Sequence, residues 1–325
     1  MSLSKIRGHD KQIEILKNAT RGNTLAHAYL FTGITGIGKM TSARALAKIL
    51  HCTNSPDNFC DNCIPCKQIA SDTHPDTLVI KPEGDTIKIG QIRKMQDQIA
   101  YTVYEGTNKI VIIDSADRMT IQSSNCLLKT LEEPPPHTII VLLTAMPYRV
   151  PSTIRSRCQR LTFQPLAESL IVELLQEKLG GKIPDNIQLI ASLAEGSLGK
   201  ALRWADNGSL AERKTLIETI NNVRKASITA IMDCAPLVGE DKETVLEKLD
   251  MLKVWLRDCA VGKVTNHPRH FINKDLVQSA QTVSSHTSWN TLFEKMRIVN
   301  ETQAAVMENV NLRLATESML LRLSH

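Results

Sequence analysis

The chain has 325 residues, of which 42% are hydrophobic and 22% charged, a balance that excludes disordered and fibrous proteins. The net charge is only +5 and aromatic residues make up 4%, which argues against a histone-like binder and against a stacking platform for single strands. Residues 1–11 are polar, and no apolar run approaches the roughly 20 residues that cross a bilayer. We therefore expect a soluble intracellular protein with no membrane partner.

Short aliphatic runs alternate with amphipathic patterns up to about Phe163. Four runs predict strands, at residues 28–31, 77–80, 109–113 and 138–143. The segments between them predict helices, at 39–49, 89–98 and 123–131, and the prolines at 134–136 end the last one. Continuous apolar strands separated by helices indicate an α/β domain with a parallel sheet covered on both faces.

After Pro165 the strand-like runs disappear. Three short helices are expected at 167–179, 185–195 and 199–205, and the chain looks wholly helical from Leu210 onward. One apolar stripe with helical spacing comprises Val245, Leu249, Leu252, Leu256 and Cys259. The layout therefore predicts three domains: an α/β domain over 1–165, a small helical domain over 166–208 and a helical tail domain over 209–325.

The first motif, GITGIGKMT at residues 33–41, lies between a predicted strand and a predicted helix. In such a GxxxxGK loop the glycines turn backbone N–H groups toward phosphates, and the lysine adds a positive charge. A plain glycine turn is the alternative. Met40 replaces the usual Ser or Thr ligand of Mg²⁺, and Thr41 points about 100° away around the helix. The expected nucleotide-binding residues are Gly33, Gly36, Gly38, Lys39, Met40 and Thr41, without an efficient magnesium ligand.

Asp114 follows the aliphatic run at 109–113, where a Walker-B aspartate would hold Mg²⁺ through water. Hydrolytic P-loop enzymes of the DExx type place a glutamate next, but this chain has Ser115. Asp117 is too far along the chain to replace that glutamate without rearrangement. The alternative is that Asp114 caps the next helix.

Four of the eight cysteines lie within fifteen positions: Cys52, Cys60, Cys63 and Cys66. Four thiolates at this spacing can close a tetrahedron around Zn²⁺, leaving no open position for catalysis. An iron–sulfur ferredoxin run would place its last cysteine later and before a proline. Four free thiols remain the alternative to a structural zinc module at about 51–67.

Two further segments contain a positively charged side chain that could contact a phosphate. Arg157 lies in a basic turn after the last predicted strand, which is either a solvated loop or an arginine finger for a neighbour's phosphate. The segment 196–201 opens a helix, where a cation could sense a γ-phosphate. Gly199 weakens that interpretation, and a simple capped helix is the alternative.

Taken in order, these motifs resemble AAA+ clamp-loader subunits. The resemblance also rests on LAHAYLF at 25–31, HPD at 74–76, LLKTLEEPP at 127–135, SRC at 156–158, GSL at 196–198, WLRD at 255–258 and NVNLRL at 309–314. It covers nearly the whole chain. It implies an AAA+ P-loop module with a zinc-knuckle insertion, a small helical lid and an all-α C-terminal collar domain for oligomerisation.

Within this family the chain resembles the delta-prime branch of the bacterial DNA polymerase III clamp loader. The active gamma and tau relatives keep a complete GKT or GKS and an Asp-Glu pair, whereas this chain has Met40 and Ser115. The sensor positions also differ, with Ala145 and Gly199. The resemblance implies a stator that donates Arg157 to a neighbour's ATP site, with weak or absent ATPase and no polymerase activity of its own. The alternative is an active ATPase subunit of the gamma/tau or small replication factor C type.

The same resemblance implies the partners and the location. A heteropentamer with delta and gamma/tau would load the sliding clamp onto primer–template DNA during replication. The implied location is the cytoplasm, at the nucleoid. Zn²⁺ is the expected structural cofactor, and whether ATP with Mg²⁺ binds is left open.

Overall fold

A computed structural model describes residues 6–55, 58–100, 108–180, 184–205, 209–222, 232, 234–265, 267–308 and 310–324. Parts of the expected features lie outside these residues: 1–5 and 101–107 of the α/β domain, 56–57 of the zinc module, 181–183 and 206–208 of the lid, and 223–231, 233, 266, 309 and 325 of the helical tail domain, with Asn309 belonging to the NVNLRL motif. The chain splits into a first unit, Met1–Leu174 with Glu195–Lys200, and a second unit, Leu175–Ala194 with Ala201–His325. The three-domain division stays a prediction.

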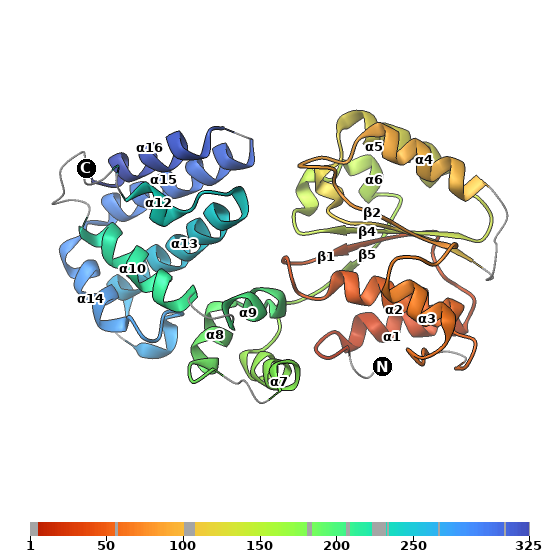
Figure 1. The fold of residues 1–325 in the computed structure, drawn as a ribbon, viewed down its shortest axis with the longest axis horizontal. Helices are drawn as coiled ribbons and strands as arrows, with labels where there is room; N and C mark the ends of the chain where they lie inside the picture. The colour runs from red at the N-terminus through yellow and green to blue at the C-terminus, as the bar shows by residue number, and fades with distance from the viewer. Residues whose placement is uncertain are drawn as a thin grey trace. The chain divides into compact units, whose positions relative to one another are not determined.

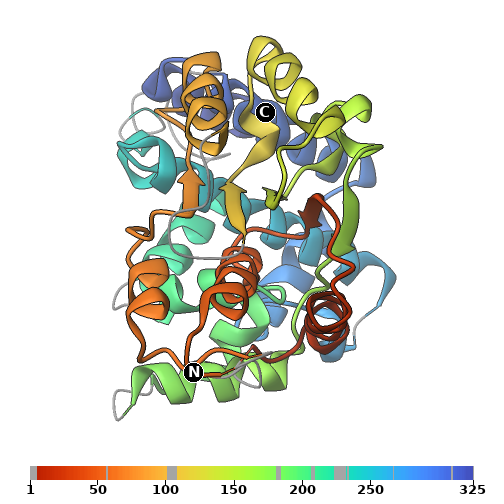
Figure 2. The same cartoon turned by 90° about the vertical axis from the view of Figure 1, so that its right-hand side faces the viewer.

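A parallel sheet of five strands forms the centre of the first unit (Figures 1 and 2). The strands are β1 (Ala28–Thr32), β2 (Thr77–Ile80), β3 (Lys109–Ile113), β4 (Thr138–Thr144) and β5 (Gln159–Thr162), in the order β2-β3-β4-β1-β5. The four strands predicted from aliphatic runs are confirmed. The prediction missed β5, because only Leu161 of this edge strand is buried and no apolar run marks it.

Helices cover both faces of this sheet. They are α1 (Asp10–Arg21), α2 (Lys39–His51), α3 (Ile64–Ala70), α4 (Ile89–Ala100), α5 (Ile121–Glu132) and α6 (Ser152–Arg155), with 3₁₀ turns η2 (Ala116–Arg118) and η3 (Pro147–Arg149). Figure 1 shows α1 to α3 on one face and α4 to α6 on the other. The predicted α2, α4 and α5 are confirmed. Helix α5 begins two residues before the expected Ser123, because the Thr120 hydroxyl accepts the Ser123 N–H at 3.1 Å and caps it.

Every described element after Thr162 is helical. The helices are α7 (Glu168–Leu179), α8 (Ile187–Leu193), α9 (Leu198–Ala205), α10 (Ser209–Asn222), α12 (Ala235–Val238), α13 (Lys242–Val264), η5 (Pro268–His270), α14 (Val277–His286), α15 (Trp289–Met307) and α16 (Leu312–Ser324). None of the described helices combines the length and the apolar character needed to span a membrane.

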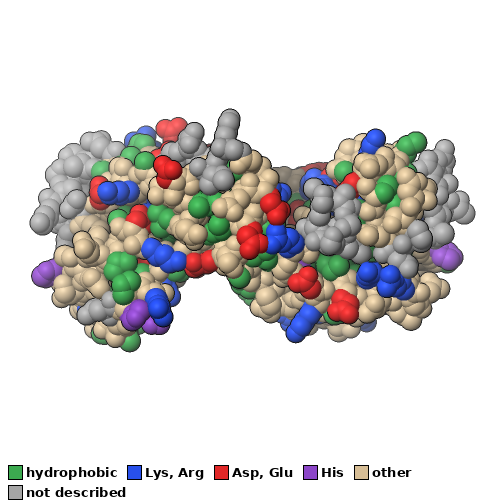
Figure 3. All heavy atoms as spheres, turned by 90° about the horizontal axis from the view of Figure 1, so that it is seen from below, with side chains coloured by type: hydrophobic (Ala, Val, Ile, Leu, Met, Phe, Trp, Pro, Cys, Tyr) green, Lys and Arg blue, Asp and Glu red, His purple; other side chains and the backbone are tan. Residues whose placement is uncertain are grey.

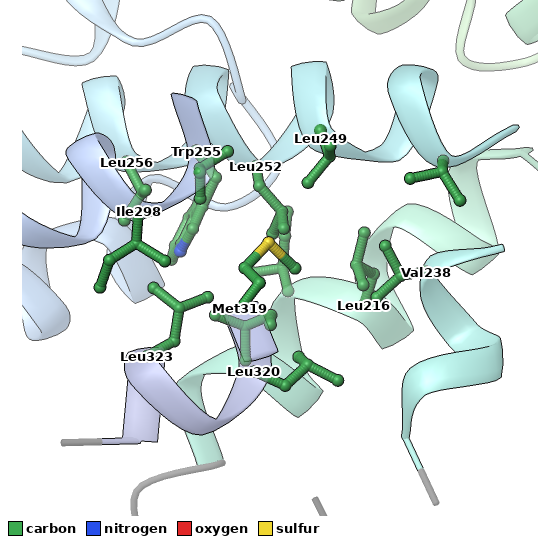
Figure 4. Packing of buried hydrophobic residues seen from close by; sticks show 14 of the residues in the cluster. Leu216, Val238, Leu249, Leu252, Trp255, Leu256, Ile298, Met319, Leu320 and Leu323 are labelled. Atoms are coloured by element: carbon green, nitrogen blue, oxygen red, sulfur yellow. The ribbon is translucent and has the colours of Figure 1, made fainter. Parts of the chain in front are cut away.

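The core of the second unit forms around α13. The predicted stripe on this helix is fully buried, and its residues pack with side chains from α10, α12, α15 and α16. Figure 4 shows Leu252 and Trp255 of α13 facing Met319 and Leu320 of α16. Burying one such leucine contributes about 1.5–3 kcal/mol. The helical periodicity therefore identified the core-facing side of α13 correctly.

Candidate functional site

The loop at 33–38 connects β1 to α2, so the strand–loop–helix context predicted for the GxxxxGK motif is present. Three of its glycines have positive φ: +151° at Gly33, +76° at Gly36 and +111° at Gly38. Glycine adopts such angles without the steric penalty of a Cβ. Backbone of this kind at a helix start can gather N–H groups around an anion.

Lys39, the motif's lysine, is buried beside this loop. Its Nζ donates hydrogen bonds to the carbonyl oxygens of Gly33 at 2.6 Å and Ile34 at 2.9 Å. Burial lowers the pKa of Lys39 to about 8, although the nearby carboxylates of Asp114 and Asp117 act in the opposite direction. The structure thus brings the predicted lysine and the predicted Walker-B aspartate into one electrostatic site.

The carboxyl ends of β3 and β4 contribute the acidic side of this site. Asp114 is half-buried directly after β3, and Ser115, at φ +55°, turns the chain away from the strand. Asp117 accepts a short hydrogen bond from the Thr144 hydroxyl, which itself accepts the Met146 N–H at 2.9 Å. The alternative that Asp114 caps the next helix is wrong, because Ser115 occupies that position and Thr120 caps α5.

Met40 and Thr41 lie in the first turn of α2. Met40 is half-buried and Thr41 is exposed. A thioether is a poor ligand for Mg²⁺, which prefers oxygen. The position next to Lys39 therefore supplies no hydroxyl for a magnesium ion, as the sequence indicates.

His9 is a site residue that the sequence analysis missed. It is buried at the start of α1, and its Nε2–H donates to the Ile37 carbonyl at 2.9 Å. The ring lies edge-on to Phe163, with centroids 4.9 Å apart, and burial lowers the pKa of His9. A lone histidine before a helix gave no sequence signal for this contact, since its partner is 28 residues away.

Arg157 lies in the turn between α6 and β5. Its side chain is 38% exposed, its Nη1 donates to the Thr153 carbonyl at 2.9 Å, and its Nη2 pairs with Glu132 at 2.7 Å. The next residue, Cys158, packs against the core, and burial raises the pKa of its thiol to about 12. The SRC motif therefore anchors a thiol inward and presents a guanidinium at the surface.

The segment 196–201, where a cation could sense a γ-phosphate, lies at the start of α9. The Ser197 hydroxyl accepts the Lys200 N–H at 3.1 Å, so the capped-helix alternative is correct for the backbone. The Lys200 ammonium pairs with Glu195 at 3.4 Å. Gly199 has no side chain to offer a phosphate.

The four clustered cysteines come together in space. Their sulfur atoms all lie within 4.8 Å of one another, and those of Cys52 and Cys63 are 4.0 Å apart. A tetrahedral zinc site with Zn–S bonds of about 2.3 Å places its sulfurs roughly 3.8 Å apart. Cys52 follows α2 and Cys66 lies on α3, so two helices position the cluster. These residues could hold a metal ion such as zinc.

The surroundings of the cluster fit a bound cation. The backbone N–H groups of Asn62 and Cys63 point to the Cys60 sulfur at 3.4 and 3.3 Å. These donors lower the pKa of Cys60, which favours the thiolate form that binds metals. Asp61, at φ +61°, forms the tight turn and pairs with Lys48 at 2.5 Å. None of the four cysteines is part of a disulfide.

Two family models match the chain. The one described as "DNA polymerase III, delta subunit" matches residues 8–167. The one described as "DNA polymerase III, delta subunit, C terminal" matches residues 207–325. Together they cover the sheet-containing region and the helical region from residue 207 onward.

The chain is also similar to individual proteins. DNA polymerase III subunit delta' of Bacillus subtilis is 32% identical over 315 residues, covering 96% of this chain and 94% of the relative. Subunit tau of the same organism is 35% identical over 209 residues, covering 61% of this chain and 36% of the relative. The solved gamma subunit-related protein of Thermotoga maritima matches with a TM-score of 0.49 and 19% identity, covering 96% of this chain and 98% of that one.

Proposed function

Because this chain belongs to the delta-prime family of DNA polymerase III clamp-loader subunits, we propose that it is the stator of such a loader. In this role it places Arg157 in the ATP site of a neighbouring gamma/tau subunit. It assembles with delta and gamma/tau into a heteropentamer that loads the sliding clamp onto primer–template DNA in the cytoplasm. The helical region 209–325 serves as the collar, and 166–208 as the lid.

The position of the Arg157 guanidinium at the protein surface is the main support for this proposal. The buried Ile154 and the half-buried Cys158 pack against the core on either side, so the guanidinium has a defined place at the surface. Its pair with Glu132 is solvent-exposed, and such pairs contribute about 0–1 kcal/mol. A phosphate offers two charge-assisted hydrogen bonds to the guanidinium fork and competes well with that carboxylate. Arg157 can therefore exchange Glu132 for a neighbour's phosphate at low energetic cost.

The test uses the reconstituted loader with an Arg157→Ala subunit. Assembly should be unchanged, and the clamp- and DNA-stimulated ATPase should fall by at least about a third, the share of one ATP site in three. Arg155→Ala is the matched control, since Arg155 is exposed two residues earlier on the same segment. An unchanged rate for Arg157→Ala, or an equal loss for both variants, would refute the finger.

A second candidate function is that of an active ATPase subunit. The closeness of Lys39 to Asp114 and Asp117 favours it. Met40 and Ser115 oppose it, because neither supplies the magnesium ligand or the carboxylate that hydrolysis requires. Turnover by the isolated chain, with Lys39→Ala as control, separates the two functions: Lys39-dependent turnover at the rate of a motor subunit supports the ATPase.

We also propose that the four clustered cysteines bind one structural Zn²⁺. With four protein thiolates the coordination is complete, so the ion would stabilise the fold rather than activate water. Metal analysis should find about one zinc per chain. Cys63→Ser should lose it, whereas Cys126→Ser, at a half-buried thiol outside the cluster, should keep it. Purified wild-type protein without zinc would contradict the proposal.

Contact with DNA in this role would be shared with the other subunits. Figure 3 shows charges of both signs interspersed on one face of the molecule, without a continuous basic patch among the described residues of that face. With a net charge of only +5, the chain would supply part of a backbone-binding surface. Binding of the loader to DNA should accordingly weaken as salt rises.

A further inference from the structure

In the GxxxxGK loop at residues 33–38, called the phosphate loop, five consecutive backbone carbonyls each accept a hydrogen bond. Three of the donors come from segments outside the motif, and all belong to the first unit. The pairs are Lys39 Nζ to Gly33 and Ile34, Ser197 Oγ to Thr35 at 2.8 Å, Gly199 N–H to Gly36 at 2.9 Å, and His9 Nε2–H to Ile37. Because these carbonyls are held, the peptide units of the loop cannot flip without breaking hydrogen bonds.

Gly36 and Gly199 meet backbone to backbone. A Cβ on Gly199 would lie 2.8 Å from the Gly36 Cα, and a Cβ on Gly36 would lie 2.5 Å from the Ser197 Oγ and 3.1 Å from the Gly199 Cα. Real Cβ atoms essentially never come within 3.0 Å of backbone. Only a pair of glycines fits this contact, so no side chain at position 199 is compatible with it.

The segment 195–200 is also fixed on its other side. The Gly196 carbonyl accepts the Leu166 N–H at 3.0 Å, and a Cβ on Gly196 would lie 2.4 Å from the Pro165 Cβ. Gly196 has φ +87°, a conformation that other residues rarely adopt. The segment is thus held between the phosphate loop and the chain that follows β5.

We propose that Ser197 and Gly199 form a latch that holds the phosphate loop in one conformation whether or not a nucleotide is bound. In this arrangement Gly199 is a positioning residue for the loop rather than a lost sensor. An arginine at position 199 would disrupt the contact instead of restoring a sensor. The inference goes beyond the stator role, because it concerns the chain's own nucleotide-type site and not Arg157.

Hydrogen–deuterium exchange on the isolated full chain tests the latch directly, since the Gly199 and Lys200 amides are themselves donors in it. Exchange over 33–39 and 195–200 should be slow, and saturating Mg-ATP should change it less than about twofold. Ser197→Ala and Gly199→Ala should each accelerate exchange in both segments roughly two- to tenfold, the range for loss of one hydrogen bond.

Gly90→Ala is the matched control, because nothing lies within 4 Å of a Cβ there, and it should leave both segments unchanged. Two results would overturn the latch: fast exchange in the wild type that ATP slows more than tenfold, or unchanged exchange in both latch variants. Neither result depends on the loader's ATPase, so failure of the latch and failure of the Arg157 proposal are separate outcomes.

Discussion

We expect Asp258 to contribute strongly to the stability of the second unit. This aspartate of the WLRD motif is fully buried on α13 and accepts the backbone N–H groups of Ile272, at 3.1 Å, and Asn273, at 2.7 Å. It also accepts the Asn273 side-chain amide at 2.7 Å and pairs with Arg257 at 2.6 Å. Asn273 in turn accepts a short hydrogen bond from the buried Arg213. One carboxylate therefore ties the loop before α14 to the core.

Removing it with Asp258→Ala leaves the backbone N–H groups of the half-buried Ile272 and the buried Asn273 without this acceptor. An unsatisfied buried donor costs about 1–3 kcal/mol, and breaking a buried charged network costs about 3–5 kcal/mol in total. We expect the free energy of unfolding of the second unit to fall by about 3–5 kcal/mol. Asp250→Ala on the same helix is the control, because Asp250 is 48% exposed and its pair with Lys253 is worth under about 1 kcal/mol.

Urea unfolding followed by tryptophan fluorescence measures this loss. Trp204, Trp255 and Trp289 are the three tryptophans of the chain, and all lie in the second unit, so the signal reports on that unit alone. If the free energy of unfolding of Asp258→Ala lies within about 1 kcal/mol of the wild-type value, or is no lower than that of Asp250→Ala, the network does not hold the loop.

Two other predictions concern the first unit. Chelation of metal, or Cys63→Ser, should lower the first unit's melting temperature by circular dichroism while leaving the tryptophan transition of the second unit in place; equal losses in both units would contradict a local zinc module. Acidification should also destabilise this unit, because burial holds the pKa of His9 below its ordinary value of 6.5. The unfolded chain then binds the proton more readily, so stability is full above pH 6.5 and is lost as the pH falls below it. His9→Gln should show a smaller loss of melting temperature between about pH 7.5 and 5.5, and an identical loss would refute this role.

Local patterns in the sequence predicted much of this protein. Aliphatic runs identified β1, β3 and β4, because strands buried along their whole length need apolar side chains throughout, and they also identified the partly buried edge strand β2. The same reasoning failed for β5, whose exposed residues leave it without that pattern. Cysteine spacing identified the metal-type cluster because its four thiols lie close in sequence as well as in space.

The candidate site was only partly predictable. The glycines and Lys39 predicted the phosphate loop, because the whole loop lies within one short sequence motif. His9 and Glu132 did not stand out, because each acts through a partner that the chain brings near only on folding. Gly199 appeared in the sequence as the absence of a sensor, whereas the structure places it in close contact with Gly36.

The sequence by itself determined the family, the α/β-then-helical layout and the residue types at the site, because these are written in local order and spacing. Tertiary structure alone decided the strand order, the pairing of Arg157 with Glu132, and the contact between Ser197 and Thr35 across 162 residues. The physical reason is that such hydrogen bonds join groups whose proximity results from packing of the whole core. No local pattern of apolar and polar residues specifies which distant carbonyl a given donor will meet.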